Sequence, residues 1–266
     1  MADTSIDIQD GIALIRFCRP EKLNAFSAGM IEELGGHYRE CDADPAVRVV
    51  VITGSRNAFC AGADMADPEV FVAGDDMPLV SSCPLSFQAW DVRKPVIAAC
   101  NGHAIGIGLG IALQCDLRVF ALEGKYGALQ NRRGVVADFG IEYLLPRLTG
   151  FERAFEILAR GSRLDGAQAL EWGLCSRAVS AADVLPAALE IAADMALNCS
   201  PLVMGMHKRL LWRGLDASRS ELVDLETRAL DFSMRAPDAH EGGAAWAGKR
   251  TPHWRDLRAE DWPDFL

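Results

Sequence analysis

Residues 95–110 decide the fold of this chain: Pro95-Val96-Ile97-Ala98-Ala99-Cys100-Asn101-Gly102-His103-Ala104-Ile105-Gly106-Ile107-Gly108-Leu109-Gly110. The first six residues are a short apolar run, which is typical of a strand buried on both faces. The glycines that follow allow a tight turn, and an apolar helix is expected over residues 108–115. Similar apolar runs occupy residues 47–53 and 117–120. Strand and helix that alternate at this short spacing predict α/β layers.

The rest of the chain divides into a mixed first half and a helical last third. Residues 6–8 and 12–17, with Asp10-Gly11 between them, predict a β-hairpin, and residues 30–38 predict a helix. Residues 66–84 are rich in proline, glycine and aspartate, which predicts a loop or a poorly formed helix, the most mobile segment of the chain. Beyond Gly140, helical periodicity covers residues 141–148, 151–160, 165–172, 181–198, 201–212 and 218–232.

Composition narrows the class of function. The 266 residues carry 27 basic and 37 acidic side chains, a formal charge of −10, so binding to nucleic acid through phosphate neutralisation is not expected. No stretch approaches the roughly 18 apolar residues of a membrane helix, and no secretory signal is visible at the N-terminus. The eight cysteines are scattered singly. They predict reduced core residues in the cytoplasm, with no disulfide frame and no metal site.

Two stretches together indicate chemistry. The glycine-rich turn at residues 101–110 places backbone N–H groups at a helix N-terminus, an arrangement that can hold a developing oxyanion. Asp138 stands alone among the apolar residues Val136, Ala137 and Phe139. A lone, partly buried carboxylate beside an oxyanion site fits proton transfer next to a carbonyl group. A dinucleotide-binding turn fits poorly, because this turn lies deep in the chain and its spacing matches only with Ile111 in place of the last glycine.

Four motifs in the same order resemble those of the crotonase (enoyl-CoA hydratase/isomerase) superfamily and together span nearly the whole chain. They are Arg19-Pro20-Glu21-Lys22-Leu23-Asn24-Ala25-Phe26-Ser27; Ile52-Thr53-Gly54-Ser55 with Ala58-Phe59-Cys60-Ala61-Gly62-Ala63-Asp64-Met65; Lys94 to Ala104 with Cys115-Asp116; and Glu241-Gly242-Gly243 with Trp246, Lys249, Arg250 and Pro252.

The resemblance implies an α/β fold of the crotonase (ClpP/crotonase) type, with a core of repeated ββα units. Residues 1–200 would form this acyl-CoA-binding core, and residues 201–266 a helical oligomerisation region. It also implies a homotrimer or a dimer of trimers. The ligand would be an acyl-CoA thioester, with coenzyme A present as part of the substrate and no separate cofactor.

The resemblance also implies site residues. The oxyanion would be held by the N–H groups of Ala63 and Ile107. Another set matches positions that surround the nucleotide and pantetheine of coenzyme A in this family: Lys22, Ala25, Ala61, Asp64 and Met65. Lys249 matches a basic residue near the ligand's phosphates that a neighbouring subunit often supplies.

Hydratases of this family use two glutamates twenty residues apart, and the matching positions here are Gly110 and Gln130. Neither residue accepts a proton near neutral pH, so water activation by that pair is not expected.

Asp138 matches a catalytic aspartate of several family isomerases, and its surroundings resemble dienoyl-CoA isomerases and the ring-modifying isomerase of aerobic phenylacetate breakdown. Desolvation should raise its pKa and make it a better base for a carbon acid. Alternatively, Asp138 caps the helix at residues 141–148. Glu142 is a second candidate acid or a solvated residue, and His103 is expected to satisfy the turn. The leading function is therefore acyl-CoA double-bond isomerisation. Hydration or another lyase or hydrolase reaction with different residues, or a catalytically silent acyl-CoA-binding protein, are the alternatives.

Overall fold

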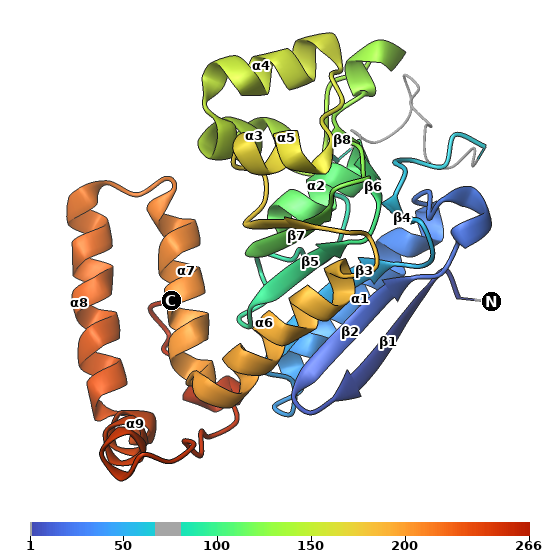
Figure 1. Cartoon of the computed structure of the whole chain (residues 1–266). Helices are drawn as coiled ribbons and strands as arrows, with labels where there is room; N and C mark the ends of the chain where they lie inside the picture. The colour runs from blue at the N-terminus through green and yellow to red at the C-terminus, as the bar shows by residue number, and fades with distance from the viewer. Residues whose placement is uncertain (1, 67–80) are drawn as a thin grey trace.

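The computed structural model describes residues 2–66 and 81–266, and a six-stranded sheet forms its centre (Figure 1). The strands lie in the order β1 (Thr4–Gln9), β2 (Ile12–Phe17), β3 (Val49–Gly54), β5 (Val96–Cys100), β7 (Leu117–Ala121) and β9 (Arg177–Val179). The hairpin pair β1 and β2 is antiparallel, and each further pairing is parallel. The predicted hairpin and the three predicted apolar strands are confirmed.

A second, three-stranded parallel sheet contains β4 (Ala58–Cys60), β6 (His103–Ile105) and β8 (Tyr126–Gly127). Each of its strands follows a strand of the large sheet along the chain, so β3–β4, β5–β6 and β7–β8 are successive units that serve both sheets. The helix α2 (Ile107–Gln114) completes the second unit. This arrangement confirms the predicted α/β class with repeated ββα units.

Helices cover both faces of the large sheet. Along β3, Val49 and Val51 pack against α6 (Val184–Asn198), whereas Val50 and Ile52 face the larger core. The helices α1 (Ala28–Ala43), α2 and α3 (Ile141–Thr149) contribute to that larger core. The continuous apolar run of β3 is therefore explained by burial on both sides, because alternate side chains serve different layers.

The helical last third is confirmed, with one addition. Its further helices are α4 (Phe151–Arg160), α5 (Gly166–Glu171), α7 (Pro201–Gly214), α8 (Arg219–Arg235) and α9 (Pro237–Gly248), of which α9 was not predicted. Short 3-10 turns occupy Pro20–Lys22, Gln130–Arg133 and Ala259–Asp261. Side chains cap several helix starts: Ser200 accepts a hydrogen bond from the N–H of Val203, and Ser218 forms a capping box with Glu221.

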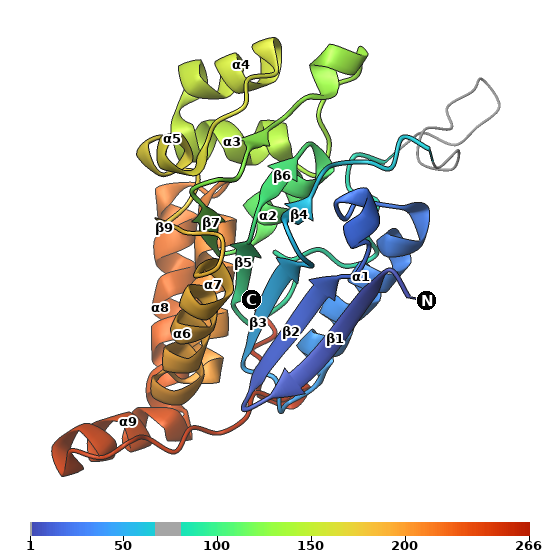
Figure 2. The same ribbon diagram turned by 45° about the vertical axis from the view of Figure 1, so that its right-hand side comes forward.

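The α7–α8 hairpin extends from the sheets, and α9 lies at the end opposite the loop that joins α7 to α8 (Figures 1 and 2). Lys208 ties α7 to the body, since its buried Nζ lies 2.8 Å from the carboxylate of Asp116 and donates to the carbonyl of Ala89 at 2.8 Å. Among residues 2–66 and 81–266, no single helix has the length and apolar character to cross a membrane; α6 and α7 reach them only as a pair bent by 117°. Most of the predicted loop at 66–84 lies outside the described residues.

Candidate active site

The glycine-rich turn places the N-terminus of α2 beside the segment that follows β4. Gly106 has a φ of 55°, which turns the chain from β6 into α2, and Ile107 is the first residue of the helix. The first N–H groups of a helix have no acceptor within the helix. A Cβ atom on Gly108 would lie 2.3 Å from the carbonyl oxygen of Cys60, so only glycine allows this close approach.

Ala63 is held by a bridge to Phe26. The N–H of Phe26 donates to the carbonyl of Gly62 at 2.8 Å, and the N–H of Asp64 donates to the carbonyl of Phe26 at 2.9 Å. In a parallel bridge of this kind the central residue directs its own N–H to the opposite side. Ala63 and Ile107 line one small cavity of about 70 Å³, and within the described chain neither N–H has a backbone acceptor. Two N–H groups without a described backbone acceptor are thus present at this cavity.

Asp138 lines the same cavity. Its Oδ1 accepts a hydrogen bond of 3.0 Å from Nε2 of Gln130. Burial raises the pKa of the Asp138 carboxyl above its ordinary value, the hydrogen bond from Gln130 opposes that rise, and the charge of Glu142 adds to it. A carboxylate with these surroundings is a stronger base than one in water.

The capping alternative for Asp138 is wrong. The helix α3 begins after Gly140, which has a φ of 73°, and no side chain caps its start. The carboxylate of Glu142 accepts a hydrogen bond of 3.0 Å from the N–H of Ala137, so Glu142 holds the end of the preceding loop. The carboxylate of Asp138 is therefore available for a role other than helix capping.

Gly110 has no room for a glutamate. A Cβ atom at this position would lie 2.5 Å from the Cβ of Phe139. Phe139 is buried, has a φ of 54° and packs edge-on against Phe26 at 5.7 Å between ring centroids. Phe139 thus occupies the space that a longer side chain on α2 would need.

The residues expected around coenzyme A are gathered in part. Ala61 and Met65 line the cavity with Ala63. The segment containing Lys22 and Ala25 runs beside them, because the N–H of Ala61 donates to the carbonyl of Leu23 at 3.1 Å.

The carboxylate of Asp64 forms ion pairs with two cations. Its carboxylate lies 2.8 Å from both Lys22 Nζ and an Arg19 nitrogen, and these cations hold the pKa of Asp64 well below its usual range. The pair with Arg19, which the sequence did not suggest, joins two loops. A direct role for the Asp64 side chain toward the ligand stays a prediction.

Lys249 lies at the exposed end of α9, at the opposite end of the molecule from β4 and β6 (Figures 1 and 2). Within one protomer it does not reach the cavity, so its predicted role depends on a neighbouring subunit.

Further residues line the cavity that the sequence did not assign to the site. Arg133 and Val135 line the cavity, as does Val136, whose side chain is 84% exposed. The hydrogen bond between Gln130 and Asp138 was also not foreseen, since spacing alone does not show which way two side chains turn. His103 accepts a hydrogen bond from the N–H of Lys125 at 3.1 Å, so its ring bonds to the loop before β8, and a role within its own turn stays a prediction.

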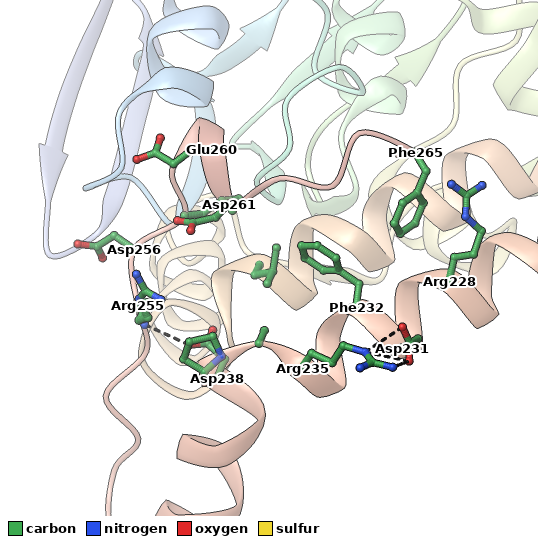
Figure 3. Close-up of a pocket in the computed structure, with 14 residues that line it drawn as sticks. Arg228, Asp231, Phe232, Arg235, Asp238, Arg255, Asp256, Glu260, Asp261 and Phe265 are labelled. Atoms are coloured by element: carbon green, nitrogen blue, oxygen red, sulfur yellow. Dashed lines mark hydrogen bonds and ion pairs between the residues drawn. The ribbon is translucent and has the colours of Figure 1, made fainter.

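A larger cavity of about 530 Å³ lies between α8, α9 and the C-terminal segment (Figure 3). Among its charged side chains, Arg235 forms an ion pair of 2.6 Å with Asp231, and Asp238 accepts a hydrogen bond from the backbone N–H of Arg255. It contains none of the predicted site residues.

Comparison with known proteins gives concordant results. The family model described as enoyl-CoA hydratase/isomerase matches residues 7–258. An enoyl-CoA hydratase of Alternaria alternata is 32% identical over 253 residues, covering 94% of this chain and 85% of that protein. A probable enoyl-CoA hydratase of Mycobacterium leprae is 32% identical, covering 94% of this chain and 96% of that protein. The crystal structure of a probable enoyl-CoA hydratase/isomerase from Mycobacterium abscessus is similar with a TM-score of 0.92 and 39% identity, over 97% of this chain and 100% of that one.

Proposed function

The chain belongs to the enoyl-CoA hydratase/isomerase family, and from this premise we propose that it moves a double bond within the acyl group of an acyl-CoA thioester. Asp138 is the proposed base. The observation that carries the proposal is its position: among the described residues that line the cavity with Ala63 and Ile107, Asp138 is the one carboxylate.

In the proposed reaction, the thioester carbonyl lies against the N–H groups of Ala63 and Ile107. Asp138 takes a proton from a carbon beside the double bond, and the electron pair moves through the acyl chain to the carbonyl oxygen. The resulting dienolate is stabilised by the two N–H groups, with the dipole of α2 adding to one of them. The protonated Asp138 then returns the proton to another carbon. One carboxylate is sufficient, because no water is consumed.

Hydration is the alternative, and the names of the relatives favour it, since those compared are described as enoyl-CoA hydratases or hydratase/isomerases. Water activation by two carboxylates has less support in this chain. Phe139 fills the space beside Gly110, and Gln130 carries no charge. Thioester hydrolysis and silent binding are further outcomes that the same assay separates.

Replacing Asp138 with asparagine tests the proposal, with turnover measured on 3-enoyl-CoA and 2-enoyl-CoA panels. Asparagine keeps an oxygen that can accept from Gln130, but it cannot take up a proton. Turnover should fall roughly 100-fold or more while acyl-CoA affinity is kept. Because burial raises the pKa of Asp138, the ionised carboxylate costs folding free energy at neutral pH, so the Asp138→Asn variant should be no less stable than the parent.

Glu142→Gln is the matched control, since Glu142 is the nearby carboxylate that influences Asp138. It should retain turnover. Full activity of Asp138→Asn would refute the proposal, and loss of activity in Glu142→Gln alone would transfer the role to Glu142. Turnover of 2-enoyl-CoA by water addition, with no isomerisation of 3-enoyl-CoA, would establish hydration instead.

A further inference from the structure

We propose that Gln130 is a positioning residue for Asp138: its side-chain amide holds the carboxylate in place and forms a hydrogen bond with it both before and after proton transfer. This inference rests on the proposed function, because it assigns to Gln130 a role in the work of Asp138. Gln130 occupies the position at which family hydratases carry a glutamate, so a hydrogen bond to Asp138 in both protonation states would explain why this chain has glutamine there.

The side-chain amide of Gln130 lies beside both Asp138 and Gly106. Gln130 is the first residue of its 3-10 turn and is only 9% exposed. Its Nε2 donates to Asp138 Oδ1 at 3.0 Å. On its other side, a Cβ atom on Gly106 would lie 3.4 Å from the same Nε2. The amide therefore lies beside both the carboxylate of Asp138 and the turn that leads to Ile107.

The oxygen of the Gln130 side-chain amide has no described hydrogen-bond donor. Oε1 of Gln130 is buried, and no described group donates to it. A buried acceptor without a donor is costly, and a catalytic role is one explanation for such a group. When Asp138 has taken up a proton it becomes a donor, and a half-turn of the amide presents Oε1 to it. A glutamine can thus bond to both forms of the carboxyl group, whereas an ionised glutamate can bond only to the protonated form.

The charged and titratable groups around Asp138 define the expected pH dependence. Burial raises the pKa of Asp138, the hydrogen bond from Gln130 lowers it, and the charge of Glu142 on α3 raises it. Arg133 lines the same cavity, and the thiol of Cys83 is close enough for Asp138 to influence its pKa. Asp138 must be ionised to act as a base. Loss of the Gln130 hydrogen bond should therefore shift the acid limb of the pH–rate profile to higher pH.

The test is the pH profile of kcat/KM for Gln130→Met, which keeps the length of the side chain and removes the amide. The acid limb should move upward by about one pH unit, since hydrogen bonds to ionised groups are the stronger ones. Turnover should fall about tenfold below the limb and recover to within about threefold of the parent above it. An equal loss at every pH with an unmoved limb would overturn the proposal, because it would indicate a structural role alone.

Gln88→Met is the matched control. Gln88 is another buried glutamine whose Nε2 donates at 3.1 Å, in this case to the backbone carbonyl of Leu85, and whose Oε1 also has no described donor. Its loss removes an equivalent hydrogen bond without touching a titrating group. The acid limb should stay at its parental pH, and a shift equal to that of Gln130→Met would overturn the assignment.

Gln130→Glu is the second variant, which keeps the volume should Gln130→Met fail to fold. A second carboxylate beside Asp138 should shift the acid limb upward by more than the methionine does. An unmoved limb in this variant would overturn the positioning role. The failure of this inference is distinguishable from failure of the proposed function: in the latter case Asp138→Asn would retain the activity of the parent, and both ideas would fall.

Discussion

Replacing Gly110 with alanine should lower both stability and turnover, which is the opposite of what helix propensity predicts. Alanine is favoured over glycine inside a helix by about 1 kcal/mol. At Gly110, however, the new Cβ atom would lie 2.5 Å from the Cβ of Phe139, whereas ordinary contact begins at 3.4 Å. To restore ordinary contact, α2 and the segment that contains Phe139 must therefore separate by roughly 0.9 Å. Overpacking of this kind costs about 1–3 kcal/mol.

The net expectation for Gly110→Ala is a loss of about 1 kcal/mol in the free energy of unfolding. Phe139 follows Asp138 directly in the chain, so a shift of Phe139 displaces the carboxylate. A displacement near 1 Å can cost up to about 100-fold in rate. Urea unfolding gives the first quantity, and steady-state turnover of an enoyl-CoA substrate gives the second.

Gly36→Ala is the matched control. Gly36 is exposed within α1, and a Cβ atom there would meet nothing within 4 Å. This variant should gain about 1 kcal/mol and keep full turnover. If Gly110→Ala behaved in the same way, with higher stability and unchanged turnover, the argument that Phe139 fills the glutamate space would be refuted.

Further outcomes are expected for pH, assembly and ligand. Burial raises the pKa of the Cys41, Cys60 and Cys115 thiols to about 12, against 9.0 for an exposed thiol. The stability that these groups contribute is present below pH 9 and is lost as the pH rises toward 12. Urea unfolding at several pH values should therefore show that the free energy of unfolding falls less steeply in Cys60→Ala than in the parent, by about 1.4 kcal/mol per pH unit. Leu211 and Leu230 are 73% and 60% exposed on α7 and α8, which supports association; light scattering should give a trimer or a multiple of it, and a monomer at micromolar concentration would contradict this. Coenzyme A should raise the melting temperature and NAD should not, whereas the reverse result would contradict acyl-CoA binding.

Local patterns were sufficient for most of the regular structure. The helix predicted over residues 151–160 coincides with α4, and the strand predicted around residues 47–53 is β3. These elements can be predicted from the sequence because hydrophobic periodicity and β-branched runs are visible within a few neighbouring residues. The strands β4, β6 and β8 are only two or three residues long, too short for a period to show. The helix α9 contains Gly242 and Gly243, which disfavour helix in isolation.

The sequence by itself determined the family, the α/β layering and the list of residues from which a site could be built. The tertiary structure decided what those residues do to one another. Asp138 does not cap α3, Phe139 occupies the space beside Gly110, and Gln130 turns its amide to Asp138. These facts depend on how the loop before α3 packs against α2. Such packing arises from the combined burial of many side chains distant in sequence, so no local pattern records it.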